Sequence, residues 1–503
     1  MANRKGHGLA HGVAGVTACL FALGLIAADA TAQTGSRPPN VVFILADDLG
    51  WRDTGVYGSR FYETPNIDAL AQRGMRFTNA YAAAPICSPT RASILTGLHP
   101  ARLGMTTASG HLARVVLDKG LRERGVENQP ALTAESVTRL RLEHFTLAEA
   151  FNAAGYRTAH FGKWHLGREP YDPYQQGFDV DLPHTPAPGP SGGYLGPWTF
   201  WEGMGRAGEH IEDRMATEAS DFMRENADRP FFLNYWCFSV HAPIQGKPHL
   251  VEKYRAKADL RSEQRNPISG AMVESLDDAV GALLDMIDDL GIAENTIIIF
   301  FSDNGGMVHR FTDGVAVTSN APLRSGKSSI YEGGVREPLI AVWPGVAAAG
   351  SVSHEIVQSV DFYPTLLEMT GLSPRPGQGF DGVSIVPALR GEQLAREAIF
   401  THSPHYTPAT LHRPSTSVRK GDWKLIRYYC DGPGQTDRHE LYNLKDDIGE
   451  TRDLARREPA KVVELGTLIE RFVSQTQAVI PVPNPRYKAG LDPFPNGAAI
   501  RSE

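Results

Sequence analysis

Cysteine is scarce in this sequence: the 503 residues contain 4. So few cysteines exclude a fold held together mainly by disulfide bonds. Once a predicted signal peptide is removed, only Cys87, Cys237 and Cys430 remain. Cys237 falls in an apolar stretch and is expected to be inert. It can pair with Cys430 only if the fold brings the two together.

The sequence also lacks a dominant charge of one sign. The chain has 50 Lys and Arg and 57 Asp and Glu, which gives a formal net charge of −7. It contains no run of basic residues of the kind that binds nucleic acid. Nucleic acid is therefore not an expected partner. Hydrophobic residues make up 42% and charged residues 21% of the chain. These values are close to globular averages, so a globally disordered chain is excluded and a sizeable core is predicted.

Long apolar runs are absent beyond the N-terminus, so no stable membrane insertion of the rest of the chain is expected. At the N-terminus, Arg4 and Lys5 precede an apolar run over residues 13–28, and Ala30-Thr31-Ala32 follows. This order predicts a secretory signal peptide over residues 1–32 and an exported protein, periplasmic or secreted. One alternative is an uncleaved anchor helix, but the apolar run is short for a membrane span. The other is a lipoprotein signal cleaved before Cys19, but the apolar run continues well past that residue.

Short apolar runs alternate with helical patterns along the chain. Buried strands are predicted at residues 40–46, 158–162, 231–240, 296–301 and 338–343, and helices at 66–73, 146–154, 212–226, 272–290 and 361–370. This alternation predicts an α/β fold with a largely parallel central sheet flanked by helices. Functional sites in such sheets lie beyond the carboxyl ends of the strands.

The pattern of predicted secondary structure changes after Gly391. Short antiparallel strands at 397–401, 415–420 and 423–429 and a helix at 459–474 predict a small C-terminal α+β subdomain. The predicted boundaries are 38–394 for the large domain, 395–480 for the subdomain and 481–503 for a Pro-rich tail. Within the large domain, residues 108–141 read as an insertion with some helix, and 183–197 as a long loop rich in Pro and Gly.

Hard oxygen donors follow two of the predicted strands. Asp47-Asp48 comes directly after the first, and Ser302-Asp303-Asn304-Gly305 follows another. If the two strand ends meet, their oxygens suit Ca²⁺ or Mg²⁺. Each pair alone is equally typical of an ordinary turn, in which Asp, Asn and Gly are common.

The segment Cys87-Ser88-Pro89-Thr90-Arg91 precedes a predicted helix, in whose first turn Pro89 fits. Arg91 would bring a fixed cation near the side chain at position 87. From these five residues, two interpretations are open: a thiolate activated by Arg91, or a buried structural cysteine.

This segment, together with Leu95-Thr96-Gly97, resembles the signature of the type I sulfatases, the formylglycine-dependent, arylsulfatase A-like family of the alkaline-phosphatase superfamily. The family's other motifs follow in order: Asp47-Asp48, Thr64-Pro65-Asn66-Ile67-Asp68, Gly162-Lys163-Trp164-His165-Leu166-Gly167, His241-Ala242-Pro243, Ser302-Asp303-Asn304-Gly305, Gly326-Lys327 and Glu332-Gly333-Gly334-Val335-Arg336. The resemblance runs from about residue 38 to residue 454. It implies an alkaline-phosphatase-like fold with a mixed, mostly parallel sheet.

The resemblance also implies a role for each matching residue. A Ca²⁺ ion is implied to bind Asp47, Asp48, Asp303, Asn304 and an oxygen of residue 87, which a maturase converts from Cys87 to formylglycine (3-oxoalanine). Arg91 is implied to hold the formylglycine hydrate, and Lys163 and Lys327 to bind sulfate oxygens. His165 is implied to contact the hydrate and later remove its proton, and His241 to protonate the leaving group.

The chemistry of a sulfate ester fits these roles. The ester is already anionic, so a divalent cation and cationic side chains offset the repulsion of an anionic nucleophile. The formylglycine hydrate has two hydroxyls. One of them attacks sulfur, and loss of the proton of the other hydroxyl then expels sulfate. The predicted function is therefore hydrolysis of a sulfate ester. The alternatives are a phosphonate or phosphate monoester hydrolase of the same superfamily and a secreted binding protein without activity.

The substrate is predicted from long polar segments. By the resemblance, residues 177–190 occupy the place where some sulfatases supply an extra sulfate contact, and His184 is predicted to face the pocket. The 401–414 loop, with His402, His405 and His412, is expected to form a polar rim over the pocket, unless it is merely a solvated loop. His405 is the predicted sugar contact. Apolar ligands prefer hydrophobic pockets, whereas residues 108–141, 183–197 and 401–414 are long and polar, so they predict a sulfated carbohydrate. The hydrogen-bonding side chains that these three segments offer are His111, Arg114, His184, His405, His412 and Arg413.

Overall fold

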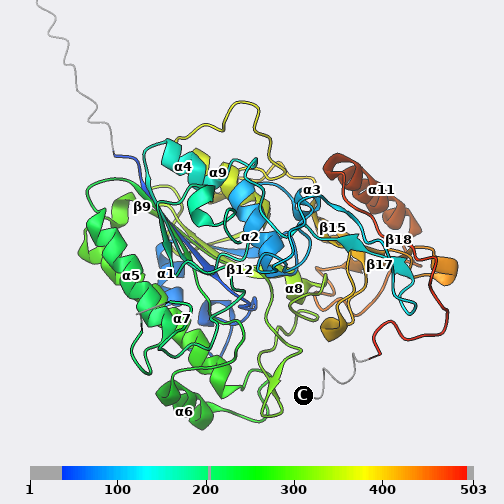
Figure 1. Ribbon diagram of the computed structural model, residues 1–503, viewed down its shortest axis with the longest axis horizontal. Coiled ribbons are helices and arrows are strands. Elements are labelled where there is room, and N and C mark those ends of the chain that lie inside the picture. The colour runs from blue at the N-terminus through cyan, green and yellow to red at the C-terminus, as the bar shows by residue number, and fades with distance from the viewer. Residues whose placement is uncertain (1–36, 202–204, 496–503) are drawn as a thin grey trace, which may run out of the picture. The chain divides into compact units, whose positions relative to one another are not determined.

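The computed structural model describes residues 37–201 and 205–495 (Figure 1). The predicted signal peptide lies outside the described residues. An eight-stranded sheet has the order β13-β2-β12-β9-β1-β8-β6-β7. Its strands are β1 (Asn40–Ala46), β2 (Met75–Tyr81), β6 (Arg157–Gly162), β7 (Val180–Leu182), β8 (Phe231–Trp236), β9 (Thr296–Ser302), β12 (Arg336–Val342) and β13 (Ser351–Gln358). Only β12 pairs antiparallel within it, which confirms the mixed, mostly parallel sheet.

The sheet is covered by helices on both faces (Figure 1). Successive side chains of a strand point to opposite faces, and β1 follows this rule: Val42 and Ile44 enter one hydrophobic cluster, while Val41 and Phe43 enter the other. The first cluster includes α1 (Pro65–Arg73), α5 (Ile211–Glu225) and α7 (Pro267–Asp289). The second includes α2 (Cys87–Thr96), α4 (Leu147–Ala153), α9 (Phe362–Thr370) and α10 (Val386–Leu389).

A separate antiparallel sheet follows in the order β14-β15-β16-β17. Its strands are β14 (Ile399–Ser403), β15 (Ser415–Lys420), β16 (Trp423–Tyr428) and β17 (Arg438–Asn443). Helix α11 (Pro459–Thr476) packs on it through Leu465 and Ile469, which join a cluster with Val418 and Leu425. The predicted antiparallel sheet and helix are confirmed, and β17 is an additional strand.

The expectation of helix in residues 108–141 is wrong. The structure has only three two-residue strands there, β3 (Gly120–Leu121), β4 (Ala131–Leu132) and β5 (Ala134–Glu135). The segment has no apolar helical period, and Gly120, Gly125 and Pro130 interrupt it. Its backbone pairs over long distances instead, because β4 binds β18 (Val482–Pro483) of the tail.

The remaining elements are short. They are α3 (Pro100–Leu103), α6 (Pro248–Lys257), α8 (Glu332–Val335), β10 (Phe311–Thr312), β11 (Val315–Ala316) and single 3-10 turns at Gly55–Tyr57, Pro173–Gln176, Ala293–Asn295, Ser359–Asp361, Pro408–Thr410 and Pro433–Gln435. As predicted, residues 183–197 form a loop. Among the helices of residues 37–201 and 205–495, none is both long and apolar enough to cross a bilayer.

Candidate active site

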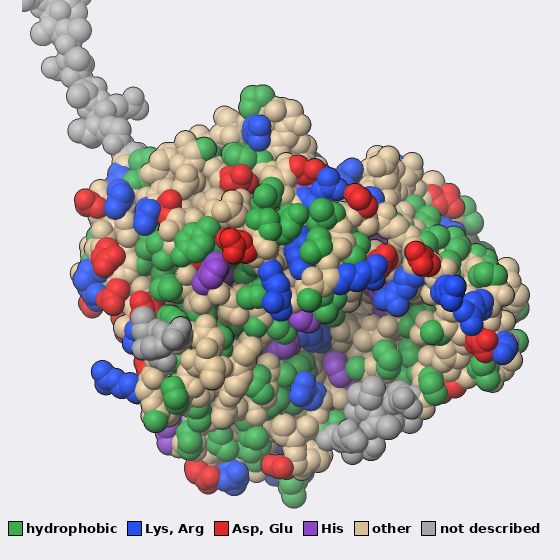
Figure 2. Space-filling view, viewed as in Figure 1, with side chains coloured by type: hydrophobic (Ala, Val, Ile, Leu, Met, Phe, Trp, Pro, Cys, Tyr) green, Lys and Arg blue, Asp and Glu red, His purple; other side chains and the backbone are tan. Residues whose placement is uncertain are grey.

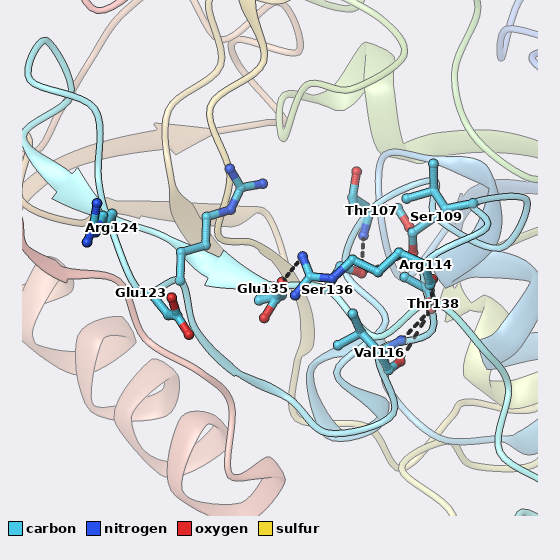
Figure 3. A pocket seen from close by; sticks show the side chains of 11 residues that line it. Thr107, Ser109, Arg114, Val116, Glu123, Arg124, Glu135, Ser136 and Thr138 are labelled. Carbon is cyan, nitrogen blue, oxygen red and sulfur yellow. Dashed lines mark hydrogen bonds and ion pairs between the residues drawn. The ribbon is translucent and has the colours of Figure 1, made fainter.

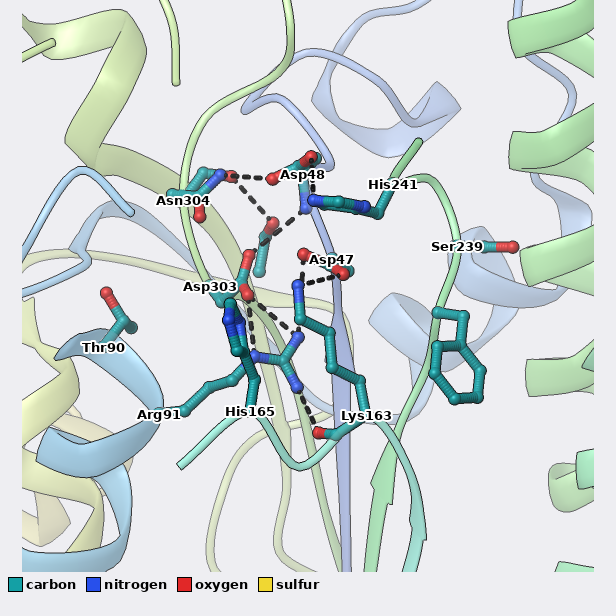
Figure 4. Close-up of polar contacts among 12 residues, drawn as sticks. Asp47, Asp48, Thr90, Arg91, Lys163, His165, Ser239, His241, Asp303 and Asn304 are labelled. Carbon is teal, nitrogen blue, oxygen red and sulfur yellow. Dashed lines mark hydrogen bonds and ion pairs between the residues drawn. The ribbon is translucent and has the colours of Figure 1, made fainter. Parts of the chain in front are cut away.

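Two neighbouring strands bring the predicted oxygen donors together. In the parallel pair β1–β9, Ala46 lies opposite Ser302, so the acidic residues that follow the two strands emerge side by side. The carboxylate oxygens of Asp47, Asp48 and Asp303 lie within 4.8 Å of one another (Figure 4). All three side chains are buried. The predicted convergence of the two strand ends is therefore confirmed.

Three basic side chains from distant parts of the chain face these carboxylates. Lys163 Nζ donates to Asp47 Oδ2 at 2.6 Å, and Lys327 Nζ donates to Asp48 Oδ2 at 2.7 Å. Arg91 Nη2 lies 2.8 Å from Asp303 Oδ2 (Figure 4). Buried charges are tolerated when they are paired and hydrogen-bonded, so each carboxylate has a cationic partner.

The local backbone is shaped to place these groups. Gly162 ends β6 with φ 106°, and a Cβ there would lie 1.9 Å from the carbonyl oxygen of Trp236. Only glycine permits this close approach, which sets Lys163 beside β8. Asp48 and His165 adopt φ of 62° and 59°, in the left-handed region that non-glycine residues rarely occupy. Such strain is typical of functional sites.

Burial and neighbouring charges act in opposite directions on the carboxylates. Burial raises the pKa of Asp47 well above its ordinary value, although Lys163 counteracts it. Burial would also raise the pKa of Asp48, but Lys327, His241 and Lys163 together bring it below its ordinary value. Asp48 is therefore held ionised by its cationic neighbours.

The donor set fits a hard cation. Asp47 Oδ1 and Asn304 Oδ1 are buried, and no described residue donates a hydrogen bond to either atom. A buried oxygen without a partner costs free energy, so a native fold normally satisfies it. Two such oxygens beside the carboxylates of Asp48 and Asp303 suit Ca²⁺, which prefers oxygen ligands.

Cys87 is the first residue of α2 and is 1% exposed. Its Sγ, a carboxylate oxygen of Asp47 and a ring nitrogen of His241 lie within 4.8 Å of one another. Burial raises the pKa of the Cys87 thiol, despite the lysines nearby. This direction disfavours the interpretation of Cys87 as an activated thiolate, which requires a lowered pKa. Cys237 and Cys430 are also free thiols and do not pair.

The two predicted catalytic histidines are held by different partners. His241 Nδ1 lies 2.7 Å from the carbonyl oxygen of Ala242, so Nδ1 carries the proton, and Nε2 lies 3.7 Å from Asp48 Oδ2. His165 Nε2 lies 2.7 Å from His111 Nδ1. Burial lowers the pKa of both His165 and His241 well below the ordinary value, and the next largest causes are the charge of Lys163 on His165 and that of Lys327 on His241. The neutral form of each ring is therefore favoured.

The two other predicted substrate contacts, His184 and His405, each have a partner within the fold. His184 is bound to Asp181 through a 2.6 Å contact of its Nδ1, and about half of its side chain is exposed. His405 is 8% exposed, and its Nε2 lies 2.7 Å from Thr106 Oγ1. His402 and His412 are likewise buried. The expectation of an exposed histidine rim is wrong for these three rings, because the 401–414 loop packs them inward; substrate contact by His184 or His405 stays a prediction.

Two histidines near the site have roles that sequence patterns did not assign. His111 stood out only as a polar residue of the 108–141 insertion, yet its ring contacts the predicted catalytic His165. His309, between β9 and β10, is close enough for the charges of Lys327 and Asp48 to act on its pKa, which burial lowers. Neither residue belongs to a recognisable motif, so their positions near the site are known only from the folded structure.

Comparisons with known proteins agree on one family. The sulfatase family model matches residues 39–372, and a model described as N-sulphoglucosamine sulphohydrolase, C-terminal, matches residues 325–477. N-acetylgalactosamine-6-sulfatase of Canis lupus familiaris is 36% identical over 415 residues, covering 77% of this chain and 73% of the relative. Arylsulfatase A of Homo sapiens is 34% identical over 476 residues, covering 86% of each chain. The structure of Ps i-CgsB in complex with k-i-k-neocarrahexaose has a TM-score of 0.69 at 26% identity, covering 87% of this chain and 93% of that one.

Proposed function

The chain belongs to the sulfatase family and has its alkaline-phosphatase-like fold, and on that premise we propose that it is an exported enzyme that removes sulfate from a sulfated carbohydrate. Its activity as a sulfuric ester hydrolase follows from the family and the curated relatives. The proposal adds the chemistry at residue 87, the metal, the place of action and the substrate class.

Residue 87 is proposed to act as formylglycine. A maturase oxidises Cys87 by two electrons, which an external oxidant such as dioxygen takes up with two protons: the Cβ–S bond breaks, sulfur leaves as hydrogen sulfide, and Cβ becomes an aldehyde whose oxygen is at the oxidation level of water. Water then adds to give two hydroxyls. One hydroxyl oxygen bonds to sulfur as the S–O bond to the alcohol breaks. Loss of the other hydroxyl proton re-forms the aldehyde as sulfate leaves, so the net reaction is hydrolysis.

The basic side chains are proposed to hold the ester. The positive charges of Lys163 and Lys327 both act to lower the pKa of Cys87, which supports a role for these lysines in binding the sulfate oxygens. Arg91 donates through Nε to Asp303 Oδ2 at 2.9 Å and is proposed to hold the hydrate in place. A Ca²⁺ ion bound by Asp47, Asp48, Asp303 and Asn304, with residue 87, would supply a fixed charge that stabilises the transition state.

The histidines are proposed to move the protons. His241 protonates the leaving alcohol through Nε2, since its Nδ1 is committed to Ala242. Burial and the lysines lower the pKa of His241 in the free enzyme, whereas the negative charge of a bound ester acts the other way. His165 accepts the proton of the second hydroxyl at Nδ1, which is buried and free of any bond to a described residue.

One observation carries the proposal: Asp47 lies within 4.8 Å of both Cys87 and His241 and also belongs to the carboxylate cluster with Asp48 and Asp303. The test is a comparison of rates on sulfated saccharides, an aryl sulfate and the matching phosphate and phosphonate esters. We expect sulfate release to be fastest from a saccharide. Faster turnover of the phosphate or phosphonate ester would instead favour the related hydrolase activity, and no turnover of any ester by protein that carries formylglycine would favour a binding protein.

Two further points belong to this proposal. The relatives named for a sulfated amino sugar and a structure solved with a hexaose support a carbohydrate substrate. The predicted signal peptide over residues 1–32 supports export to the periplasm or medium. Fractionation of the host tests export: recovery of the chain in the cytoplasm with residues 1–32 intact would contradict it.

A further inference from the structure

A second polar cavity lies in the insertion that follows the Cys87 segment. It has a volume of about 490 Å³, and residues 107–138 line it (Figure 3). Three arginines take part, Arg114, Arg122 and Arg124. Arg114 pairs with Glu135 at 2.6 Å. Arg122 and Arg124 are exposed, and neither forms an ion pair with any described residue. Glu123 also lines the cavity, so three arginines stand against two glutamates there, and the lining carries a net positive charge.

The cavity shares a wall with the reaction centre. Ser109 and Leu112 line the cavity, and His111 between them contacts His165. Gly110 lies so close to the centre that a Cβ there would be 1.8 Å from the carbonyl oxygen of His165. Figure 2 shows Lys and Arg side chains gathered around a hollow in which histidine side chains are visible. A chain of sugars whose ester is held at residue 87 therefore has a cationic wall beside it.

We propose that this cavity is a subsite for a second anionic group, a sulfate or a carboxylate, on a sugar unit next to the one that is desulfated. The proposal rests on the proposed function and narrows its substrate to polyanionic saccharides. A guanidinium can direct two N–H donors to two oxygens of a planar carboxylate or of a tetrahedral sulfate. Binding energy from such a remote group also positions the ester that reacts.

The test uses Cys87→Ala protein, in which turnover is blocked, and calorimetry with disaccharides that share one sulfate. One disaccharide has no further anion, one has a second sulfate, and one has a carboxylate. We expect a second anion to tighten binding by about tenfold and Arg122→Ala/Arg124→Ala to abolish that gain. Arg390→Ala, which removes an exposed arginine that does not line the cavity, is the control.

Comparison of the second sulfate with the carboxylate shows which anionic group the cavity binds. A gain with only the sulfate or only the carboxylate assigns the subsite to that group. No gain with either, or a gain that survives the double substitution, overturns the subsite. A separate measurement of aryl sulfate turnover by the unsubstituted enzyme tests the proposed function. Failure of the proposed function is therefore distinguishable from failure of the subsite.

A different observation supports a second inference. The 2.7 Å contact between His111 Nδ1 and His165 Nε2 requires one ring to donate and the other to accept. Ser88 Oγ donates to the carbonyl oxygen of His165 at 2.7 Å and fixes its backbone. We infer that His111 is a positioning residue: it accepts from Nε2–H of His165 and so leaves the Nδ1 lone pair free to take the hydrate proton.

This role, which also rests on the proposed function, predicts a specific kinetic defect. His111→Ala should lower kcat about 10- to 100-fold, in the range of lost supporting contacts. The value of kcat/KM should change little, because it reports only the steps up to alcohol release. With an aryl sulfate, a burst of about one phenol per enzyme should appear. His111→Asn, whose amide oxygen replaces Nδ1 as the acceptor, should restore most of kcat. An unchanged kcat, a slow His111→Ala enzyme without a burst, or no rescue by Asn would overturn the inference.

Discussion

Lys163 Nζ lies 2.6 Å from Asp47 Oδ2, and both side chains are completely buried. A lysine proposed to bind sulfate is thus held by a carboxylate proposed to bind metal. Lys327 and Asp48 repeat this relationship at 2.7 Å. The cation-binding and anion-binding halves of the site therefore form one charge network, and changes on either side should affect both stability and catalysis.

Removing one partner of this network should destabilise the fold. Lys163→Met leaves the Asp47 carboxylate buried without its nearest cation, and we expect it to lower the free energy of unfolding by about 3 kcal/mol in metal-free protein. Chemical denaturation measures the loss. Adding Asp47→Asn to Lys163→Met should recover much of it, whereas additive losses in the double variant would show that the two side chains are not coupled.

Calcium binding should depend on the strand-end carboxylates. Asp303→Ala removes one of the three clustered carboxylates and should abolish calcium binding, measured by calorimetry, together with sulfate release. Asp313→Ala, an exposed aspartate after β10, is the matched control and should change neither. Full activity of Asp303→Ala, or full activity of the parent enzyme after calcium removal, would count against the metal site.

Loss of His241 should matter most for poor leaving groups. An alkoxide needs a proton in the transition state, and general acid catalysis contributes about 10²- to 10⁴-fold. His241→Ala should therefore lower kcat/KM for an alkyl sulfate far more than for an aryl sulfate with an acidic phenol. Steady-state kinetics on a series of leaving groups tests this. Equal losses across the series would remove His241 from the role of acid.

The buried histidines of the 401–414 loop should make the fold sensitive to acid. Burial lowers the pKa of His405 to about 3 and that of His412 to about 4, from 6.5. The unfolded chain therefore takes up protons first, so stability is full above about pH 6.5 and falls as the pH drops toward the folded-state pKa values. Between pH 6.5 and 5, each ring should cost roughly 2 kcal/mol.

Denaturation of the parent protein and of His405→Gln at pH 7 and pH 5 measures this contribution. The variant should lose less stability between the two pH values than the parent does. His249→Gln, which replaces an exposed histidine, is the control. An identical pH dependence for the parent and His405→Gln would show that His405 is not the acid-sensitive group.

The residues that the sequence predicted best lie at the ends of buried strands. Continuous apolar runs mark β1 and β9, and their parallel pairing brings Asp48 and Asp303 together by geometry alone. Strand β2 escaped detection because polar residues such as Arg76 and Asn79 interrupt its apolar pattern. The predicted strand at 231–240 ends at Trp236 instead, where the chain leaves the sheet to deliver His241.

The contacts of the insertion escaped prediction for a different reason. The position of His111 depends on Gly110, which lets two backbone segments touch, and no periodic pattern encodes such an approach. Likewise, the histidines of the 401–414 loop looked like solvent-facing polar groups, but His405 is buried and contacts Thr106, which lies just before the insertion. Long-range packing of irregular segments decides both outcomes.

The central claim is that residue 87 works as formylglycine, and mass spectrometry of the peptide that contains it tests this most directly. Protein made in a host with the maturase and shown to release sulfate should carry the aldehyde mass at position 87, and Cys87→Ala should fold but release none. Sulfate release by protein whose Cys87 is entirely unmodified, or by Cys87→Ala, would contradict the account.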